Sequence, residues 1–295
     1  MERRCRQLMG ERRVTIVGMG LMGASMAEGL TRKGYRVSGI DVDRRALDYC
    51  RDKGIIEEGY ERPEEILGET DLLIMAIYPK GMIKFIEKYR GEFKKGLVLT
   101  DICGIKLSFV DEVQKLMPQG CQFVGAHPMA GREKTGAEHG EPEIFLGANF
   151  IVTPTERNTE EGIAAVEEIA RDLSFGRISR LSPARHDNMV AFTSQLTHAI
   201  AVALVNSDRD EDTYSFTGDS YRELTRIAMI NEELWSELFL ENRENLIGKI
   251  EDFQEKLEVI KGALLSGEGE ILKREFRSST ARRKQLREKR NEVDL

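Results

Sequence analysis

A glycine-rich turn between an apolar run and a helical pattern is the feature that most constrains this chain. The segment VTIVGMGLMGASMAEGL holds Gly18, Gly20 and Gly23 in the spacing GxGxxG. In a dinucleotide-binding fold the first glycine permits the tight turn, the second lets the backbone approach a pyrophosphate, and the third lets the helix pack closely on the strand. The first amides of the helix then face the phosphate charge. Because strand, turn and helix occur in the required order, we predict a dinucleotide site rather than a turn without a ligand.

An aspartate at the end of the next apolar run completes this pattern. Asp41 follows the turn by about 20 residues, where an acidic side chain can bind the ribose diol. Its carboxylate would repel the 2′-phosphate of NADP, so we expect NAD and consider NADP less favoured, although Arg44 and Arg45 follow closely. The expected cofactor-binding residues are Gly18, Met19, Gly20, Leu21, Met22, Gly23, Asp41, Ile77, Asp101 and Cys103.

Strand-length apolar runs alternate with helical patterns up to about residue 155, and helical patterns dominate after it. The expected strands are Arg13–Gly18, Tyr35–Asp41, Asp71–Ile77, Leu97–Asp101, Gln122–His127 and Phe150–Pro154. This alternation predicts an α/β Rossmann-type doubly wound parallel sheet with helices on both faces. We therefore expect an NAD-binding domain over residues 1–155 and an all-α substrate and dimerisation domain over residues 156–295.

The helical half contains two helices of particular interest. Residues 189–205 are apolar nearly all round, which predicts a central helix buried on most faces, too short and too polar for a membrane span. Residues 234–253 form an amphipathic pattern of the kind that pairs two subunits, so we expect a homodimer. Residues 266–295 are polar and mixed in charge, which predicts a solvated terminal helix.

Composition narrows the class of protein. The net charge of −7 argues against nucleic acid as the main partner. The four cysteines, Cys5, Cys50, Cys103 and Cys121, form no CxxC pair, and the polar first residues are neither a signal peptide nor a membrane anchor. We expect reduced thiols, a cytoplasmic location, no membrane association and no bound metal.

His127 is the candidate proton acceptor. It ends a predicted strand, and ligands bind outside the carboxyl ends of strands in open parallel sheets. The small residues Gly125, Ala126, Ala130 and Gly131 leave room for a substrate and a nicotinamide ring. A neutral imidazole can accept a hydroxyl proton during hydride transfer. The alternative is a histidine that only satisfies a loop carbonyl, and the upstream cofactor motif favours the base.

Polar residues within the helical half are further candidates. Ser194 and His198 are four residues apart and share one helix face, which suits either a core network or a site. Arg226 lies in the apolar stretch LTRIAMI, where a guanidinium needs an anion. A substrate carboxylate would serve, and so would Glu223 or Glu232.

Five motifs, taken in this order, resemble the prephenate dehydrogenase family, which includes the arogenate dehydrogenases. They are GMGLMGAS, DICGIK, GAHPMAGREKTG, TSQLTHAIA, and YRELTRIA followed by LW, and they lie within roughly residues 13–262. The resemblance implies a Rossmann domain followed by a helical dimerisation domain. It also implies NAD-dependent oxidative decarboxylation of prephenate to 4-hydroxyphenylpyruvate in tyrosine biosynthesis, or of arogenate directly to tyrosine.

The resemblance assigns a role to each matching residue. His127 matches the histidine that accepts the proton of the ring hydroxyl, and Arg226 matches the arginine that binds a substrate carboxylate. Trp235, which its spacing alone would assign to helix packing, matches an aromatic near the substrate. The remaining matches line the pocket or its mouth: Ser194, His198 and Glu133.

Two residues depart from the family pattern. Gly104 stands where many members carry the serine of a D-x-x-S-x-K motif, so a hydroxyl contact to the histidine or the nicotinamide is missing or replaced by water. Thr197 stands where many members carry proline. Neither departure removes the proton acceptor or the anion site.

Two other functions fit parts of the sequence. A β-hydroxyacid dehydrogenase shares the Rossmann start but needs a helix lysine, and no lysine occurs between Arg180 and Arg222. A non-enzymatic NAD-sensing protein would not need His127, Arg226 and His198 together.

Overall fold

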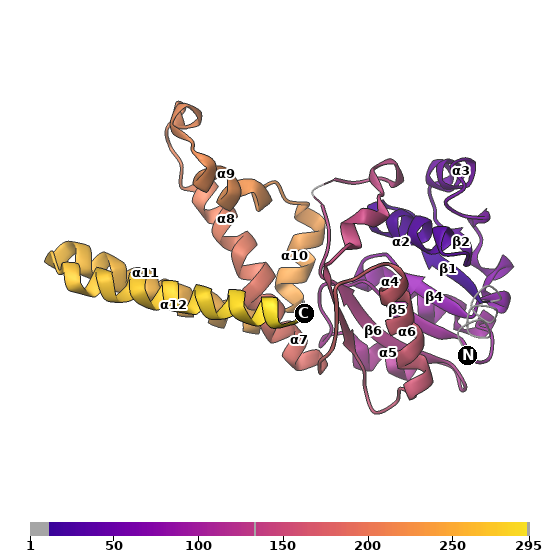
Figure 1. The fold of residues 1–295 in the computed structure, drawn as a ribbon. Coiled ribbons are helices and arrows are strands. Elements are labelled where there is room, and N and C mark those ends of the chain that lie inside the picture. The colour runs from indigo at the N-terminus through magenta and orange to yellow at the C-terminus, as the bar shows by residue number, and fades with distance from the viewer. Residues whose placement is uncertain (1–11, 133, 294–295) are drawn as a thin grey trace.

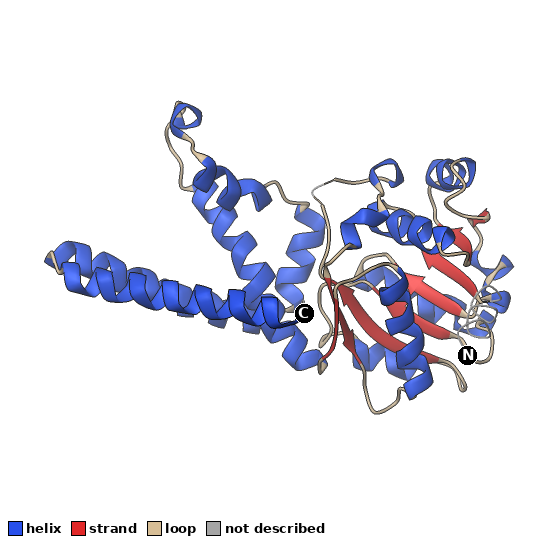
Figure 2. Ribbon diagram, in the orientation of Figure 1, coloured by secondary structure: helices blue, strands red, loops and turns tan. Residues whose placement is uncertain are grey.

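The structure, a computed structural model, describes residues 12–132 and 134–293. A sheet with helices on both faces forms one part, and the later helices extend from one side of it (Figures 1 and 2). Eight strands lie in the order β3-β2-β1-β4-β5-β6-β7-β8. All neighbours pair in parallel except β6 and β7, which are antiparallel. The strands are β1 (Arg13–Val17), β2 (Arg36–Ile40), β3 (Glu58–Tyr60), β4 (Leu72–Met75), β5 (Val98–Asp101), β6 (Gln122–Pro128), β7 (Asn149–Thr153) and β8 (Arg177–Arg180).

The helices divide between the sheet and the second part. Those beside the sheet are α2 (Leu21–Arg32), α3 (Arg44–Asp52), α4 (Pro79–Tyr89), α5 (Val110–Leu116) and α6 (Glu160–Asp172). Those of the second part are α7 (Pro183–Val190), α8 (Leu196–Asn206), α9 (Asp219–Thr225), α10 (Glu232–Glu241), α11 (Arg243–Ser266) and α12 (Gly269–Val293). Short 3₁₀ turns are η1 (Pro63–Glu65), η2 (Leu67–Glu69), η3 (Arg90–Glu92), η4 (Ala137–His139), η5 (Pro142–Phe145), η7 (Thr213–Phe216) and η8 (Arg226–Ala228), and a π turn, η6 (Ala191–Gln195), joins α7 to α8.

Two apolar cores lie on the two faces of the sheet. One contains buried residues of α2, α3 and α6, and the other contains those of α4 and α5. The strands alternate their side chains between these faces, so β1 contributes Val14 and Ile16 to the first core and Val17 to the second. Leu238 of α10 belongs to the second core, so the helical part is anchored in the sheet's own core.

The predicted Rossmann sheet is confirmed, with two strands that the sequence analysis missed. All six expected strands are present, and β3 and β8 are additional. Because β8 pairs with β7, the sheet continues to Arg180. The domain boundary expected near residue 155 therefore lies too early, since α6 and β8 complete the sheet layer.

The apolar helix expected over residues 189–205 is longer and less buried than we expected. Helices α7 and α8 continue through the π turn as one segment, Pro183–Asn206, of 24 residues. By length and composition alone this segment is long and apolar enough to cross a membrane, contrary to the expectation that it is too short and too polar. Only 28% of its apolar window is buried within the chain. Its buried polar residues, His186, Asp187 and Gln195, are bonded to other parts of the protein.

The amphipathic helix expected over residues 234–253 is broken at Asn242, between α10 and α11. Its side-chain amide donates to the carbonyl of Asp187 at 3.0 Å and to Oε1 of Gln195 at 2.7 Å, which holds the junction in a non-helical conformation. Helices α11 and α12 form an antiparallel hairpin that extends away from the sheet, and α12 is the solvated terminal helix that we expected (Figure 1).

Candidate active site

The glycine-rich turn has the geometry that a dinucleotide requires. Gly18 has φ +94°, and a Cβ there would lie 2.5 Å from the carbonyl oxygen of Ala76. A Cβ on Gly23 would lie 1.9 Å from the carbonyl oxygen of Gly18, so helix and turn touch at this point. A Cβ on Gly20 would meet nothing within 4 Å, which leaves the approach to the first turn of α2 open. These residues fit NAD, with the pyrophosphate at the open N-terminus of α2.

Asp41 lies directly after β2 and is bonded to the same turn. Its carboxylate accepts the main-chain amides of Met19 at 2.6 Å and Asp43 at 2.8 Å. The side chain of Met19 is buried and packs at the position of Gly39, so Met19 can offer the cofactor only its backbone. The nearby Arg45 bonds to Asp43.

The remaining expected cofactor contacts differ in exposure. Ile77 packs against Gly18, with its Cγ2 2.7 Å from where a Cβ would stand, so it lies at the turn. Cys103 is buried and donates its thiol to the carbonyl of Ile77 at 3.7 Å. Burial and the neighbouring Asp101 charge raise the pKa of the Cys103 thiol. It is therefore a neutral packing group beside the turn.

Asp101 does not lie at a surface that the cofactor can reach. It is 1% exposed, and Oδ2 bonds to Nζ of the fully buried Lys106 at 2.8 Å. The same oxygen accepts the amide of Cys103, and Oδ1 accepts the amide of Ala126 at 2.9 Å. Lys106 also donates to the carbonyl of Cys103 at 2.6 Å. Asp101 thus ties β5 to β6, and we correct its expected role from cofactor contact to support of the strand that carries His127.

His127 lies at the carboxyl end of β6, as the sequence predicted, and is half-buried. Its Nδ1 lies 2.9 Å from Nε2 of His186, and Nδ1 of His186 lies 2.6 Å from Oδ1 of Asp187. His186 and Asp187 are 0% and 1% exposed. The sequence analysis missed this pair, which it treated only as part of a helix start. Gly125 precedes His127 on the same face, and a Cβ there would strike Thr153 Oγ1 at 2.5 Å, so this position requires glycine.

The pKa values of both histidines are lowered. Burial lowers the pKa of His127, and the neighbouring His186 and Lys106 charges lower it further. Burial also lowers the pKa of His186, opposed by its bond to Asp187. His127 is therefore neutral at neutral pH, as a proton acceptor must be.

Gly104 lies beside His127. A Cβ at Gly104 would stand 3.9 Å from Cε1 of His127 and 3.6 Å from both methyl carbons of Leu238. These are ordinary contact distances. The position where many members of the family have serine is therefore adjacent to the histidine in this chain as well.

His198 and Trp235 form an aromatic pair between α8 and α10. Their ring centroids are 3.6 Å apart with 30° between the planes, and Trp235 packs edge-on against Phe239 at 5.7 Å. Nδ1 of His198 donates to the carbonyl of Ser194 at 2.9 Å. Ser194 thus contributes its backbone to the orientation of His198.

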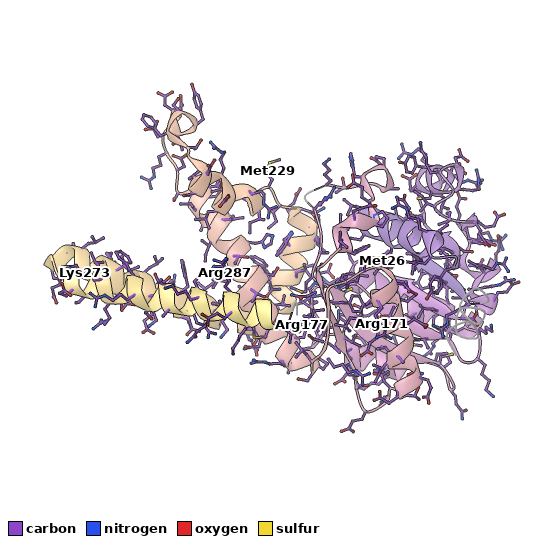
Figure 3. All side chains as sticks on the ribbon, viewed as in Figure 1. Met26, Arg171, Arg177, Met229, Lys273 and Arg287 are labelled. Atoms are coloured by element: carbon purple, nitrogen blue, oxygen red, sulfur yellow. The ribbon has the colours of Figure 1, made fainter. Side chains whose placement is uncertain are left out.

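Arg226 begins η8 and is exposed, so the expectation of a desolvated guanidinium within an apolar segment was wrong. The turn η8 packs on α8, and Met229, which follows the turn and is labelled in Figure 3, is 85% exposed. Glu133, expected at the pocket mouth, lies outside the residues that the structure describes.

The helical part meets the carboxyl edge of the sheet through a few specific contacts. The amide of Lys80 at the start of α4 donates to Glu237 at 3.3 Å, and the side chain of Leu238 packs in the second core of the sheet. Both carboxylate oxygens of Asp187 accept backbone amides of the loop after β5. Helices α7 and α10 therefore lie against the sheet edge that carries the glycine turn and His127.

Among the described residues no cluster of three His, Cys, Asp or Glu side chains is placed to hold a metal.

Several known proteins are similar to this chain in sequence or in structure. A cyclohexadienyl dehydrogenase of Zymomonas mobilis is 27% identical over 93% of this chain and 96% of its own length. A prephenate dehydrogenase of Bacillus subtilis is 24% identical over 90% of this chain and 74% of its own length. The structure of prephenate dehydrogenase from A. aeolicus, in complex with hydroxyphenyl propionate and NAD+, is 28% identical, with a TM-score of 0.85 over 93% of this chain and 98% of that one.

Two family models match most of the chain. Residues 26–176 match the nucleotide-binding domain of prephenate dehydrogenase, and residues 182–278 match its dimerization domain. The gap between the two matches, residues 177–181, contains β8, so the second match begins just after the last strand of the sheet. With the glycine turn, His127 and the helical part in this order, the chain belongs to the prephenate dehydrogenase family of NAD-dependent oxidoreductases.

Proposed function

We propose that this protein oxidises prephenate with NAD and decarboxylates it to 4-hydroxyphenylpyruvate, a step of tyrosine biosynthesis. The observation that carries the proposal is the neutral His127 at the carboxyl end of β6, bonded to a buried histidine and aspartate on the helical part. NAD supplies the hydride acceptor. The chain's own residues have to orient the ring, remove one proton and bind the carboxylates.

The proton and electron movements set what His127 has to do. Prephenate carries a hydroxyl and a hydrogen on one ring carbon and a carboxylate on the carbon opposite. The hydrogen leaves as hydride while His127 accepts the hydroxyl proton. The bond to the ring carboxylate then breaks, carbon dioxide leaves, and its electron pair makes the ring aromatic. The resulting phenolate oxygen takes a proton back, so His127 returns to its neutral form.

Residues of both parts supply the other contacts in this proposal. The Arg226 guanidinium binds a substrate carboxylate through charge-assisted hydrogen bonds. His198, held by the Ser194 carbonyl and stacked on Trp235, lines the pocket beside the ring. Glu133 acts at the pocket mouth. Asp41 holds the ribose of the cofactor, and Ile77 and Cys103 form the wall beside the glycine turn.

Arogenate is the second candidate substrate. It shares the cyclohexadienyl ring and differs from prephenate only at the side chain. The likeness to a cyclohexadienyl dehydrogenase keeps this candidate open, because that name covers the ring and not the side chain. The groups that His127 and the cofactor act on are the same in both substrates.

We also propose that the protein is a cytoplasmic homodimer joined through the helical part. The apolar segment Pro183–Asn206 leaves most of its apolar window unburied within one chain. Further apolar side chains are exposed on α11 and α12: Ile247, Leu257, Leu264, Leu265 and Phe276. A second copy covers such a surface without any foreign partner.

Absorbance at 340 nm tests the activity. The purified protein is mixed with prephenate or arogenate, and with NAD or NADP, and initial rates are measured for all four pairs. We expect the highest kcat/KM with prephenate and NAD, with carbon dioxide released in equal amount to the NADH formed. Reduction of NAD without release of carbon dioxide, or no reduction with either ring acid, contradicts the proposal.

A further inference from the structure

We propose that His186 and Asp187 are positioning residues that hold the ring proton of His127 on Nδ1 and so leave Nε2 as the acceptor. The inference rests on the proposed function, in which His127 takes the substrate's hydroxyl proton. It concerns two residues that do not touch the reacting atoms and act through His127.

The order of the hydrogen bonds determines the tautomers. A carboxylate only accepts, so Nδ1 of His186 must carry the hydrogen that it donates to Asp187 Oδ1 at 2.6 Å. In neutral His186 the other nitrogen, Nε2, then has a lone pair. It lies 2.9 Å from Nδ1 of His127, which must donate to it. Nε2 of neutral His127 therefore carries no hydrogen.

The position of Asp187 makes this chain of bonds rigid. Its Oδ1 accepts the amide of Lys106 at 2.9 Å, and its Oδ2 accepts the amide of Leu107 at 2.7 Å. Its own carbonyl accepts from Asn242 at 3.0 Å. The carboxylate is thus fixed between the loop after β5 and the α10–α11 junction, and neither it nor His186 has access to solvent.

The surrounding charges favour a single hydrogen between Nδ1 of His127 and Nε2 of His186, so that both rings stay neutral. The groups that face them are Lys106, which opposes a positive charge on either ring, and Asp101 and Asp187, which favour one on His186. Lys106 and Asp101 neutralise one another as a buried pair. Asp187 is therefore the group that compensates the charge that appears when Nε2 of His127 accepts the substrate's proton.

This arrangement predicts what changes when the carboxylate becomes an amide. In Asp187→Asn, an amide nitrogen in the place of Oδ1 would donate to Nδ1 of His186 and would remove the acceptor of the Lys106 amide. The hydrogen of His186 then moves to Nε2, His127 accepts it at Nδ1, and Nε2 of His127 becomes protonated. The ring would remain in place with the wrong tautomer, as in a triad whose aspartate is replaced.

The experiment reads the tautomer and the rate together. Ring nitrogens are labelled with 15N, and their chemical shifts report which nitrogen carries the hydrogen. The chain has only four histidines, so single substitutions assign the signals. We expect an unprotonated Nε2 on His127 in the wild type. In Asp187→Asn we expect a protonated one, with kcat lowered roughly 10²- to 10⁴-fold and KM changed much less.

Variants at His186 leave the bonds between Asp187 and its loop in place and so address folding. His186→Phe removes the acceptor for His127 Nδ1, and His186→Gln puts an amide oxygen near the same place. We expect a large loss of kcat in the first and partial recovery in the second. Asp172→Asn is the matched control, because Asp172 accepts a bond from Tyr35 at 2.6 Å on the opposite edge of the sheet.

The outcomes separate this inference from the proposed function. If the wild type reduces no NAD with either substrate, the proposed function fails, and the nitrogen shifts still decide the tautomer. The inference is overturned by a protonated Nε2 on His127 in the wild type. It is also overturned if folded Asp187→Asn and His186→Phe proteins keep an unprotonated Nε2 and a kcat close to the wild-type value.

Discussion

The main-chain amide of Met19 lies 2.6 Å from Oδ2 of Asp41, so the glycine turn and the end of β2 are joined directly. A second amide, that of Asp43, fixes the other oxygen at 2.8 Å. Because both oxygens are held, the carboxylate cannot rotate away from the place where the ribose hydroxyls of a dinucleotide would lie. A 2′-phosphate would meet a fixed negative charge there.

Asp41→Ala should therefore narrow the preference for NAD over NADP. A charge pair near a protein surface is worth about 1–4 kcal/mol, so the ratio of the two kcat/KM values should fall roughly 10-fold or more. Asp252→Ala on α11 makes the same change in net charge far from the turn and should leave the ratio unchanged. A wild-type protein that already prefers NADP would show that Arg44 or Arg45 decides the choice.

His127→Asn should lower kcat roughly 10²- to 10⁴-fold, because the proton acceptor is lost. The wild-type kcat/KM should also fall at low pH, since protonated His127 cannot accept. Burial lowers the pKa of His127 below its ordinary 6.5, so the neutral ring persists to lower pH and the midpoint of this limb should lie below 6.5. Steady-state rates between pH 5 and 9 measure it. A variant that keeps both the rate and the limb excludes His127 as the acceptor.

Gly104→Ser tests the departure from the family pattern. A Cβ at this position makes only ordinary contacts with Leu238 and His127, so the fold should tolerate it. A hydroxyl beside the histidine can add one hydrogen bond, worth about 0.5–1.5 kcal/mol, and should raise kcat/KM by up to about tenfold. Gly104→Ala separates the hydroxyl from the added carbon and should leave kcat/KM near the wild-type value. Equal effects of serine and alanine would mean that the hydroxyl has no role.

Local sequence patterns predicted the central strands but not the edges of the sheet. Strands β1, β2, β4, β5, β6 and β7 carry apolar runs because both faces are covered. Strand β3 is only Glu58–Tyr60, and β8 is Arg177–Arg180 with no fully buried residue. Edge strands of this kind carry little apolar signal, so their pairing is evident only from the folded chain.

The site was predictable where one motif held the chemistry, and not where two distant segments meet. His127 follows from its place at a strand end after a dinucleotide turn. His186 is 59 residues further along, and nothing in its local sequence distinguishes it from a residue of a helix's first turn. Asp101 misled the sequence analysis for a related reason, because its partner Lys106 neutralises it only once both are buried.

Arg226→Ala should raise KM for the substrate with little change in stability. The residue is exposed on a short turn, so its removal leaves no cavity in the core. A charge-assisted hydrogen bond to a carboxylate is worth about 1.5–3 kcal/mol, which corresponds to a rise in KM of roughly 10- to 100-fold. Arg222→Ala removes the same kind of charge from the neighbouring α9 and is the matched control, for which we expect an unchanged KM. A fall in melting temperature with an unchanged KM would assign Arg226 to an internal ion pair.

The exposed apolar surface of α8 makes a prediction about assembly. Most of the apolar window of the segment Pro183–Asn206 is not buried within one chain, and Val205 near its end is 38% exposed. If a second copy covers this surface, a carboxylate at Val205 would be buried in the interface without a partner, at a cost of several kcal/mol. The wild type should therefore sediment at micromolar concentration with twice the chain mass, and Val205→Asp should shift towards the monomer.

A control on the other part of the molecule separates the interface from general solubility. Leu146 is 72% exposed beside the sheet, so Leu146→Asp introduces the same charge on an apolar position without touching α8 and should remain dimeric. Because Val205 is already partly exposed within one chain, Val205→Asp should keep its helical circular dichroism. A wild type that sediments as a monomer would contradict the dimer itself. A dimeric Val205→Asp would instead move the interface from the end of α8 to the exposed leucines of the α11–α12 hairpin.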